Sequence, residues 1–296
     1  MIQQIEKFQI KNWELVSINP NNRNWNWTDY FNYWAISVQS VISFSLIASL
    51  YLLYDLNSII VLAGSIFAAI LIYFFSNLIG KISQSSGLSF PVILRLSMGF
   101  NGARYIGMIR GLAGIFMFGV QTFFISKSIG YLIRIFVYEI NYQFINNDIF
   151  FYFFFGMNLI DLIALVLTLL FQFYLFTNGQ ERNRIFIKFC SIFVYLGLFI
   201  FLIIIVSENL NDLIKSLTLS TTTVNFIAKK NILPLISITG TMFAYFSILI
   251  LTFGDFSRYA KNINEMKKGN LSLIINLILF SILSILIVIG SDIILT

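Results

Sequence analysis

Seven stretches of the chain are long, apolar and almost free of charged side chains. They cover residues 30–54, 56–80, 105–138, 149–180, 189–207, 231–254 and 269–291. The third stretch also contains Arg110, Lys127 and Arg134, and the fourth contains Asp161. A helix needs about 20 apolar residues to cross a hydrocarbon core of about 30 Å, and each stretch provides about that length. The sequence therefore predicts an all-α, multi-spanning membrane protein that lies in a lipid bilayer.

The composition supports this class and excludes most enzymes. Only 11% of the 296 residues are charged, whereas a typical soluble domain has about 25%. The chain has no His and one Cys, Cys190, which excludes His proton relays, His/Cys metal sites and an internal disulfide framework. The spans also lack paired carboxylates. We therefore expect that the protein is not an enzyme and has no cofactor.

The distribution of charge predicts the orientation in the membrane. Residues 1–29 carry several charges and no apolar core of a signal peptide, so we expect a cytoplasmic N-terminal segment. With a single span at 149–180, most of the 19 Lys and Arg residues then lie on the cytoplasmic side. Two spans there would turn the clusters at 182–188 and 258–268 outward. The net charge of +6 thus reflects orientation, and we expect no nucleic-acid partner.

Two spans carry polar residues that a plain membrane helix does not need. The first has Gln39 among four serines between Ser37 and Ser45. These residues are typical of close helix packing, or of a helix that unwinds near the midplane and exposes carbonyls to a cation. In the third span, Gln121 lies one turn after Met117. Its amide could bond another helix or recognise the hydrogen-bonding edge of a heterocycle.

Two further segments carry motifs near the cytoplasmic side. The connection at 81–104 combines Gly and Pro with two arginines, which predicts a turn and a short amphipathic piece. It is either a solvated loop or a gating element. After the sixth span, Asp255 and Arg258 are spaced to pair on a helix surface or to anchor it at the interface. Asp161 is a functional candidate because it is an acid within a span.

Four segments together resemble the nucleobase:cation symporter-1 family, which contains the uracil, cytosine, allantoin and hydantoin permeases. Residues 23–34 (RNWNWTDYFNYW) resemble the family's R-T-W entry into its first helix. Residues 90–103 (FPVILRLSMGFNGA) resemble F-P-V-x-x-R-x-S-F-G-x-x-G-A. Residues 118–122 (FGVQT) and 255–261 (DFSRYAK) resemble W-F-G-x-Q-T and D-F-S-R-Y-A-K. The resemblance covers about residues 25–290.

The resemblance implies an inverted-repeat, amino-acid/sodium-symporter-like fold of twelve helices, with substrate and cation between broken helices one and six. Residues 30–207 would form the complete first repeat of five helices. Residues 208–230 would form an outer loop, and 231–296 the start of a truncated second repeat. Helix eight, which supplies cation ligands in sodium-coupled relatives, would lie outside this chain. We therefore expect no cation-dependent uptake by these 296 residues alone.

The resemblance also implies site residues. The substrate would contact a set of residues on helices one, three and six: Met117, Gln121, Tyr245, Phe246 and Ile42. Half of a Na⁺ site would come from the carbonyls of Val38 and Val41. The gating and structural motifs would contribute Pro91, Arg95, Gly99, Asp255 and Arg258.

Two positions depart from the family pattern. Met117 replaces an aromatic residue that stacks on the substrate ring, and Phe246 stands where the family has a ring-covering Trp. A thioether can still cover a ring face, but aromatic stacking at Met117 is lost. The altered pair predicts that the ligand differs from the usual nucleobases.

These features predict a secondary active transporter, or a fragment of one, in the bacterial inner (plasma) membrane. It would import a nucleobase, either purine or pyrimidine, or a related small nitrogen heterocycle together with Na⁺ or H⁺. The alternative is a non-transporting membrane protein derived from this family, such as a receptor or assembly subunit.

Overall fold

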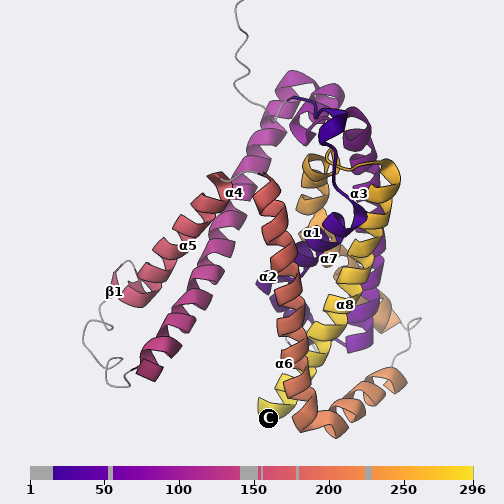
Figure 1. Cartoon of the computed structure of the whole chain (residues 1–296). Coiled ribbons are helices and arrows are strands. Elements are labelled where there is room, and N and C mark those ends of the chain that lie inside the picture. The colour runs from indigo at the N-terminus through magenta and orange to yellow at the C-terminus, as the bar shows by residue number, and fades with distance from the viewer. Residues whose placement is uncertain are drawn as a thin grey trace, which may run out of the picture. The chain divides into compact units, whose positions relative to one another are not determined.

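A computed structural model describes residues 16–52, 56–140, 153–154, 156–177, 180–223 and 229–295. Figure 1 shows that almost all of these residues are helical. They fall into two compact units, Met1–Gly99 with Ile187–Thr296 and Phe100–Phe186.

Eight α-helices account for nearly all of the regular structure in the described residues. They are α1 (Trp27–Val38), α2 (Val41–Leu52), α3 (Ser58–Ser86), α4 (Phe90–Ile140), α5 (Leu159–Thr177), α6 (Gln180–Thr223), α7 (Lys229–Ser257) and α8 (Ile263–Leu295). A 3-10 turn at Pro20–Asn22 precedes α1. The strands β1 (Phe153–Phe154) and β2 (Met157–Asn158) pair antiparallel before α5.

The helices confirm the prediction of an all-α, multi-spanning membrane protein. Six of them are long and apolar enough to cross a membrane, and the bent pair α1 and α2 makes a seventh if the two form one span. The fourth stretch contains one such helix, α5, as expected. Asp55, the residue between the first two predicted spans, lies outside the described residues. The inverted-repeat relationship stays an expectation.

The segment at 81–104 folds as a turn and the start of a helix. The helix α3 ends at Ser86, and Gly87 follows in the left-handed conformation with φ of 72°. The helix α4 begins at Phe90, and its first part ends at the non-helical backbone of Gly99. Its direction changes at Gly99, where φ is 69° and ψ is −179°. Only glycine adopts this backbone conformation readily.

The expected outer loop at 208–230 is largely helical in the structure. The helix α6 continues to Thr223 after a break at Asn209, where φ is −133° and ψ is 32°. The break lies close to the predicted end of the fifth span at Ser207. The helix α7 also differs from expectation, because it runs unbroken from Lys229 to Ser257 with Pro234 inside it.

The first unit is a bundle in which α3 packs against α7 and α8, and α1 packs against α8 (Figure 1). Large apolar side chains fill its interior, including Trp34, Phe253 and Phe280. A buried polar contact also crosses the bundle. The Asn270 amide accepts a hydrogen bond from Nε1 of Trp34 at 3.1 Å and donates one to Asn77 at 3.0 Å. Such amide contacts between membrane helices satisfy polar groups that lipid cannot.

The second unit is built on α4 and α5, which are joined by an ion cluster. The carboxylate of Asp161 on α5 accepts hydrogen bonds from Lys127 and, at 2.7 Å, from Arg134, both on α4. Arg134 also donates to Asn158 at 3.1 Å. The buried Asp161 is therefore an ion-pair partner of two of the three cations that the sequence places in the third span.

Candidate functional site

The helix break between α1 and α2 is the most unusual feature of the first unit. The two helices bend by 55° within the first predicted span. The last turn of α1 closes with the hydrogen bond from the Gln39 N–H to the Ala35 carbonyl at 3.0 Å. The new helix then begins at Val41. The sequence left open whether this hydroxyl-rich span is a tightly packed helix or an unwound one. In the structure, the helix is interrupted.

Ser40 organises the start of α2. Its hydroxyl accepts the backbone N–H of Ser43 at 3.1 Å, in the manner of a helix cap. The same hydroxyl lies 2.9 Å from Oγ of Ser43 and 3.0 Å from the hydroxyl of Tyr245 on α7. The break is thereby connected to α7, where sequence analysis expected part of the substrate site.

Tyr245 and Phe246 have different surroundings. The two rings meet edge to face with centroids 4.9 Å apart. Tyr245 is half-buried and reaches the break, whereas Phe246 is only 1% exposed and lies in the apolar core. Tyr245 is therefore the more accessible ring beside the break, and Phe246 packs behind it.

Gln39 is the polar side chain at the centre of the break. It is only 8% exposed, and neither atom of its amide makes a hydrogen bond of normal geometry with any residue that the structure describes. An unsatisfied buried amide costs about 1 to 3 kcal/mol. This unused hydrogen-bonding capacity makes Gln39 the strongest candidate for a ligand contact.

Two further polar residues lie close to Gln39. The amide of Gln39 is beside the phenol of Tyr195 on α6. The Tyr195 hydroxyl in turn donates a hydrogen bond to Oδ1 of Asn276 on α8. Asn276 is fully buried, and its Nδ2 group donates to the backbone carbonyls of Ser272 at 2.8 Å and Phe31 at 3.4 Å. A chain of three polar side chains, Gln39, Tyr195 and Asn276, therefore leads from the break to α6 and α8.

The residues proposed for a cation also flank the break. Val38 is the last residue of α1 and is buried, and its carbonyl accepts the Ser40 N–H at 3.0 Å. Val41 is 50% exposed, and its carbonyl accepts the Ser45 hydroxyl at 2.9 Å. Ile42 is half-buried beside it. Across the described part of the chain, no group of three or more Cys, Asp or Glu side chains could hold a metal ion. Cation binding at the break stays a prediction.

Three of the sequence motifs meet at one end of the first unit. Oδ1 of Asp255 accepts the backbone N–H of Phe90 at 2.9 Å, so the carboxylate caps the start of α4 beside Pro91. Arg258 is 7% exposed, and its Nε donates to the Asp255 carbonyl at 3.2 Å. Trp25 forms a parallel bridge with the segment after α7, with its N–H bonded to the Tyr259 carbonyl at 3.0 Å.

These contacts give the motifs a structural role at the junction of three segments. Arg95 lies on the exposed part of α4, and Gly99 provides the change of direction described above. A role of these residues in gating stays a prediction.

Met117 and Gln121 belong to the second unit. They lie one helical turn apart on α4, as expected, and both are half-buried. The break, Tyr245 and Phe246 belong to the first unit. A substrate contact shared between these two groups of residues stays a prediction.

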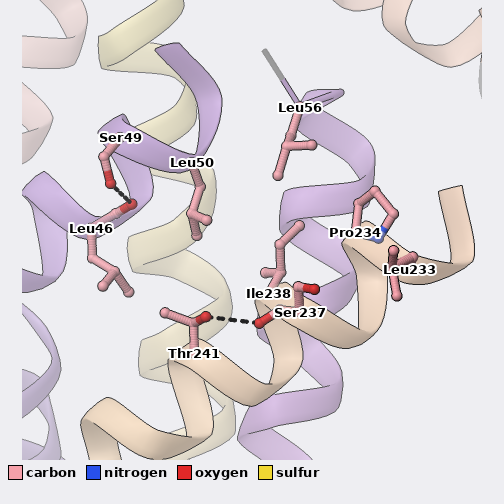
Figure 2. A pocket seen from close by; sticks show the side chains of 9 residues that line it. All are labelled: Leu46, Ser49, Leu50, Leu56, Leu233, Pro234, Ser237, Ile238 and Thr241. Carbon is pink, nitrogen blue, oxygen red and sulfur yellow. Dashed lines mark hydrogen bonds between the residues drawn. The ribbon is translucent and has the colours of Figure 1, made fainter. Parts of the chain in front are cut away.

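A cavity of about 520 Å³ lies between α2, α3 and α7 (Figure 2). The lining is mainly aliphatic and consists of Leu46, Ser49, Leu50, Leu56, Leu233, Pro234, Ser237, Ile238 and Thr241. The hydroxyls of Ser49 and Thr241 donate to carbonyls of their own helices, each at 2.8 Å. Thr241 precedes Tyr245 by one helical turn. None of the lining residues belongs to the break, and the cavity offers little polar recognition of its own.

Comparison with known proteins identifies the family. Residues 17–296 match the family model described as permease for cytosine/purines, uracil, thiamine and allantoin. The chain belongs to this family. It is 30% identical over 111 residues to the "Putative allantoin permease" of Escherichia coli (strain K12), which is 37% of this chain and 23% of that protein. It is 27% identical over 125 residues to the "Allantoin permease" of Bacillus subtilis (strain 168), which is 42% of this chain and 25% of that protein.

The matched segments thus span about a quarter of each curated permease. No solved structure matches the chain. The family match confirms the resemblance that the four sequence motifs indicated.

Sequence analysis of this permease-family chain missed several polar residues near the break. Gln39 and Ser40 were noticed only as part of a hydroxyl-rich span, and Tyr195 and Asn276 were not singled out. All four share one feature that could have identified them in the sequence. Each is a polar residue within a charge-free apolar stretch. Their convergence depends on the packing of α1, α6 and α8, which the sequence pattern does not specify.

Proposed function

We propose that the chain belongs to a secondary active transporter that binds a nucleobase or a related small nitrogen heterocycle at the break between α1 and α2. The observation that carries this proposal is the buried, unsatisfied amide of Gln39 at an interrupted membrane helix. Broken helices in transporters commonly form substrate sites, because the interruption leaves polar groups available within the membrane.

A small heterocycle suits the chemistry of the break. The edge of a nucleobase or hydantoin ring alternates N–H donors and carbonyl acceptors, and a glutamine amide offers both kinds of group. The half-buried ring of Tyr245 lies at the same break and provides an aromatic surface. Membership of a family described as permeases for cytosine/purines, uracil, thiamine and allantoin supports this class of substrate. The two relatives, both named as allantoin permeases, favour allantoin-like ligands within it.

Coupling to Na⁺ or H⁺ would use the same interruption. The carbonyls of Val38 and Val41 and the hydroxyl of Ser40 are neutral oxygen atoms at the break. Neutral oxygens can coordinate a metal cation but do not titrate near neutral pH. This chemistry favours Na⁺ over H⁺ at the break. The distribution of Lys and Arg supports a cytoplasmic N-terminus. The bacterial origin of the two relatives supports placement in a bacterial inner membrane.

The test is uptake by the full-length protein in proteoliposomes. Labelled uracil, cytosine, allantoin and hydantoin are supplied with an imposed gradient of Na⁺ or of H⁺. Gln39→Leu should weaken substrate binding by about 1 to 3 kcal/mol, because a buried partner on the ligand is left unpaired. Ser37→Ala is the matched control, since the Ser37 hydroxyl bonds only its own helix at the Tyr33 carbonyl, 2.7 Å away.

Three outcomes separate the possible functions. Gradient-driven uptake that is impaired by Gln39→Leu and preserved in Ser37→Ala supports the proposed transporter. Tight binding without uptake under either gradient would favour the receptor or assembly subunit instead. Uptake that is unaffected by Gln39→Leu would place the substrate elsewhere in the protein.

A further inference from the structure

The orientation of Asn276 is determined by its backbone neighbours. Its amide nitrogen faces the carbonyl oxygens of Ser272 and Phe31, at 2.8 Å and 3.4 Å. Carbonyl oxygens only accept hydrogen bonds, so the Asn276 side chain must direct its NH₂ group toward them. Oδ1 of Asn276 is therefore left facing the Tyr195 hydroxyl, and it can only accept.

The orientation of Asn276 in turn fixes the role of Tyr195. A phenol has one hydrogen, and the Tyr195 hydroxyl uses it to donate to Oδ1 of Asn276. Its oxygen keeps only acceptor capacity for any other neighbour. The Gln39 amide lies beside this phenol. Only the Nε2 side of the Gln39 amide can pair favourably with that oxygen.

We propose that Tyr195 and Asn276 are positioning residues that hold the Gln39 amide with its carbonyl oxygen available to the ligand. The site would then select heterocycles that present an N–H donor to Gln39, such as a lactam or imide N–H. It would reject rings in which that nitrogen carries a methyl group. This inference rests on the proposed function, because it assigns the substrate class of the same site.

The positioning group draws on three helices of the first unit. Gln39 follows α1, Tyr195 is on α6, and Asn276 is on α8. The stacked rings of Phe31 and Tyr195, with centroids 6.4 Å apart, keep the phenol against α1. Amide orientation therefore depends on contacts that are remote from the break in the sequence.

The experiment compares binding of matched N–H and N-methyl ligands to the full-length protein in lipid nanodiscs. The probes are hydantoin and uracil, each with its two monomethyl derivatives and its N,N′-dimethyl derivative. All of these retain both ring carbonyls, so only the N–H donors change. We expect dimethylation to weaken binding to the parent protein by about tenfold or more. One monomethyl derivative of each ring should show most of this loss.

Three variants distinguish recognition by Gln39 from simple steric exclusion. Gln39→Met keeps a similar side-chain volume without hydrogen-bonding groups, and Tyr195→Phe removes the hydroxyl that orients the amide. Both should reduce the preference for the unmethylated ring severalfold. Ser191→Ala is the control on the same helix, because it removes the hydrogen bond that the Ser191 hydroxyl on α6 donates to Oδ1 of Asn32 on α1 at 2.6 Å. It should leave the preference unchanged.

The possible results separate the inference from the proposed function. Dimethyl derivatives that bind the parent protein as well as hydantoin and uracil would overturn the inference, although the proposed function would stand. A preference that persists in Gln39→Met would also overturn it, since methyl groups would then be excluded by shape. Failure of every probe to bind the parent protein would overturn the proposed function itself, and the inference with it. If Tyr195→Phe does not fold, the comparison of Gln39→Met with the parent protein still distinguishes recognition by Gln39 from steric exclusion.

Discussion

Ser40 connects three groups through a single hydroxyl at the break. It caps the first turn of α2 through the Ser43 N–H, contacts the Ser43 hydroxyl, and lies 3.0 Å from the Tyr245 hydroxyl. Its neighbours Ser37 and Ser45 instead bond to carbonyls of their own helices, at 2.7 Å and 2.9 Å. Ser40 therefore supports the interruption, while the bonds of Ser37 and Ser45 are compatible with continuous helix.

Ser40→Ala should destabilise the protein by about 1 kcal/mol, the usual cost of losing a side-chain helix cap. It should also weaken heterocycle binding, because Tyr245 loses its contact at the break. Thermal unfolding and ligand titration of the purified full-length protein measure the two effects. Ser45→Ala is the matched control and should change neither. Equal effects of the two substitutions would show that Ser40 has no special role at the break.

In the second unit, the carboxylate of Asp161 lies between the cationic side chains of Lys127 and Arg134. Its side chain is 7% exposed, whereas those of Lys127 and Arg134 are 32% and 28% exposed. Asp161→Asn should destabilise this unit by about 1 to 3 kcal/mol, since two partly exposed cations lose their hydrogen bonds to a charged carboxylate. Lys127→Met should have a smaller effect, because Arg134 remains paired. Chemical denaturation in detergent measures both, and a larger loss from Lys127→Met would contradict this assignment.

At the scale of elements, α4 owes its change of direction to Gly99. No atom lies within 4 Å of the position of an added Cβ there, so space does not require glycine. The backbone conformation requires glycine, because φ is 69° and ψ is −179°. The requirement for glycine is therefore purely conformational. Gly99 is the last residue of α4 in the first unit, and Phe100 is its first residue in the second unit.

Gly99→Ala should destabilise the protein by about 1 to 3 kcal/mol through backbone strain. Gly107→Ala, farther along α4, is the opposite case, since Gly107 is helical and also has open space around it. That substitution should stabilise the helix by about 0.5 to 1 kcal/mol. Thermal unfolding of the two variants checks the signs. The account of Gly99 fails if both substitutions stabilise the protein.

At the scale of the whole molecule, the sequence predicts the spans better than the contacts between them. Charge-free apolar stretches locate the membrane helices, because lipid requires length and low polarity. The same pattern leaves Gln39 open to two interpretations, because its neighbours Tyr195 and Asn276 are distant in the sequence. Asp255 is a similar case. Its spacing from Arg258 suggests a local pair, but it gives no sign that the carboxylate also caps α4 by accepting the Phe90 N–H.

The sequence pattern also does not predict where each helix ends. Residues 208–230 are polar enough to suggest a loop, yet α6 continues to Thr223. Polarity excludes a span but does not exclude a helix outside the hydrocarbon core. The family motifs, in contrast, were specific because each fixes several residue types at once. Three of them meet in space beside the start of α1, the start of α4 and the end of α7.

The central claim is that a small nitrogen heterocycle binds at the break between α1 and α2, and cysteine labelling tests it most directly. The only native cysteine is removed as Cys190→Ser, and Val41→Cys places a thiol at the break, where Val41 is 50% exposed. Leu52→Cys, 49% exposed at the far end of α2, is the control. We predict that saturating hydantoin or uracil slows maleimide labelling at position 41 severalfold and leaves position 52 unchanged. Labelling at position 41 that proceeds at the same rate with bound ligand would contradict the claim.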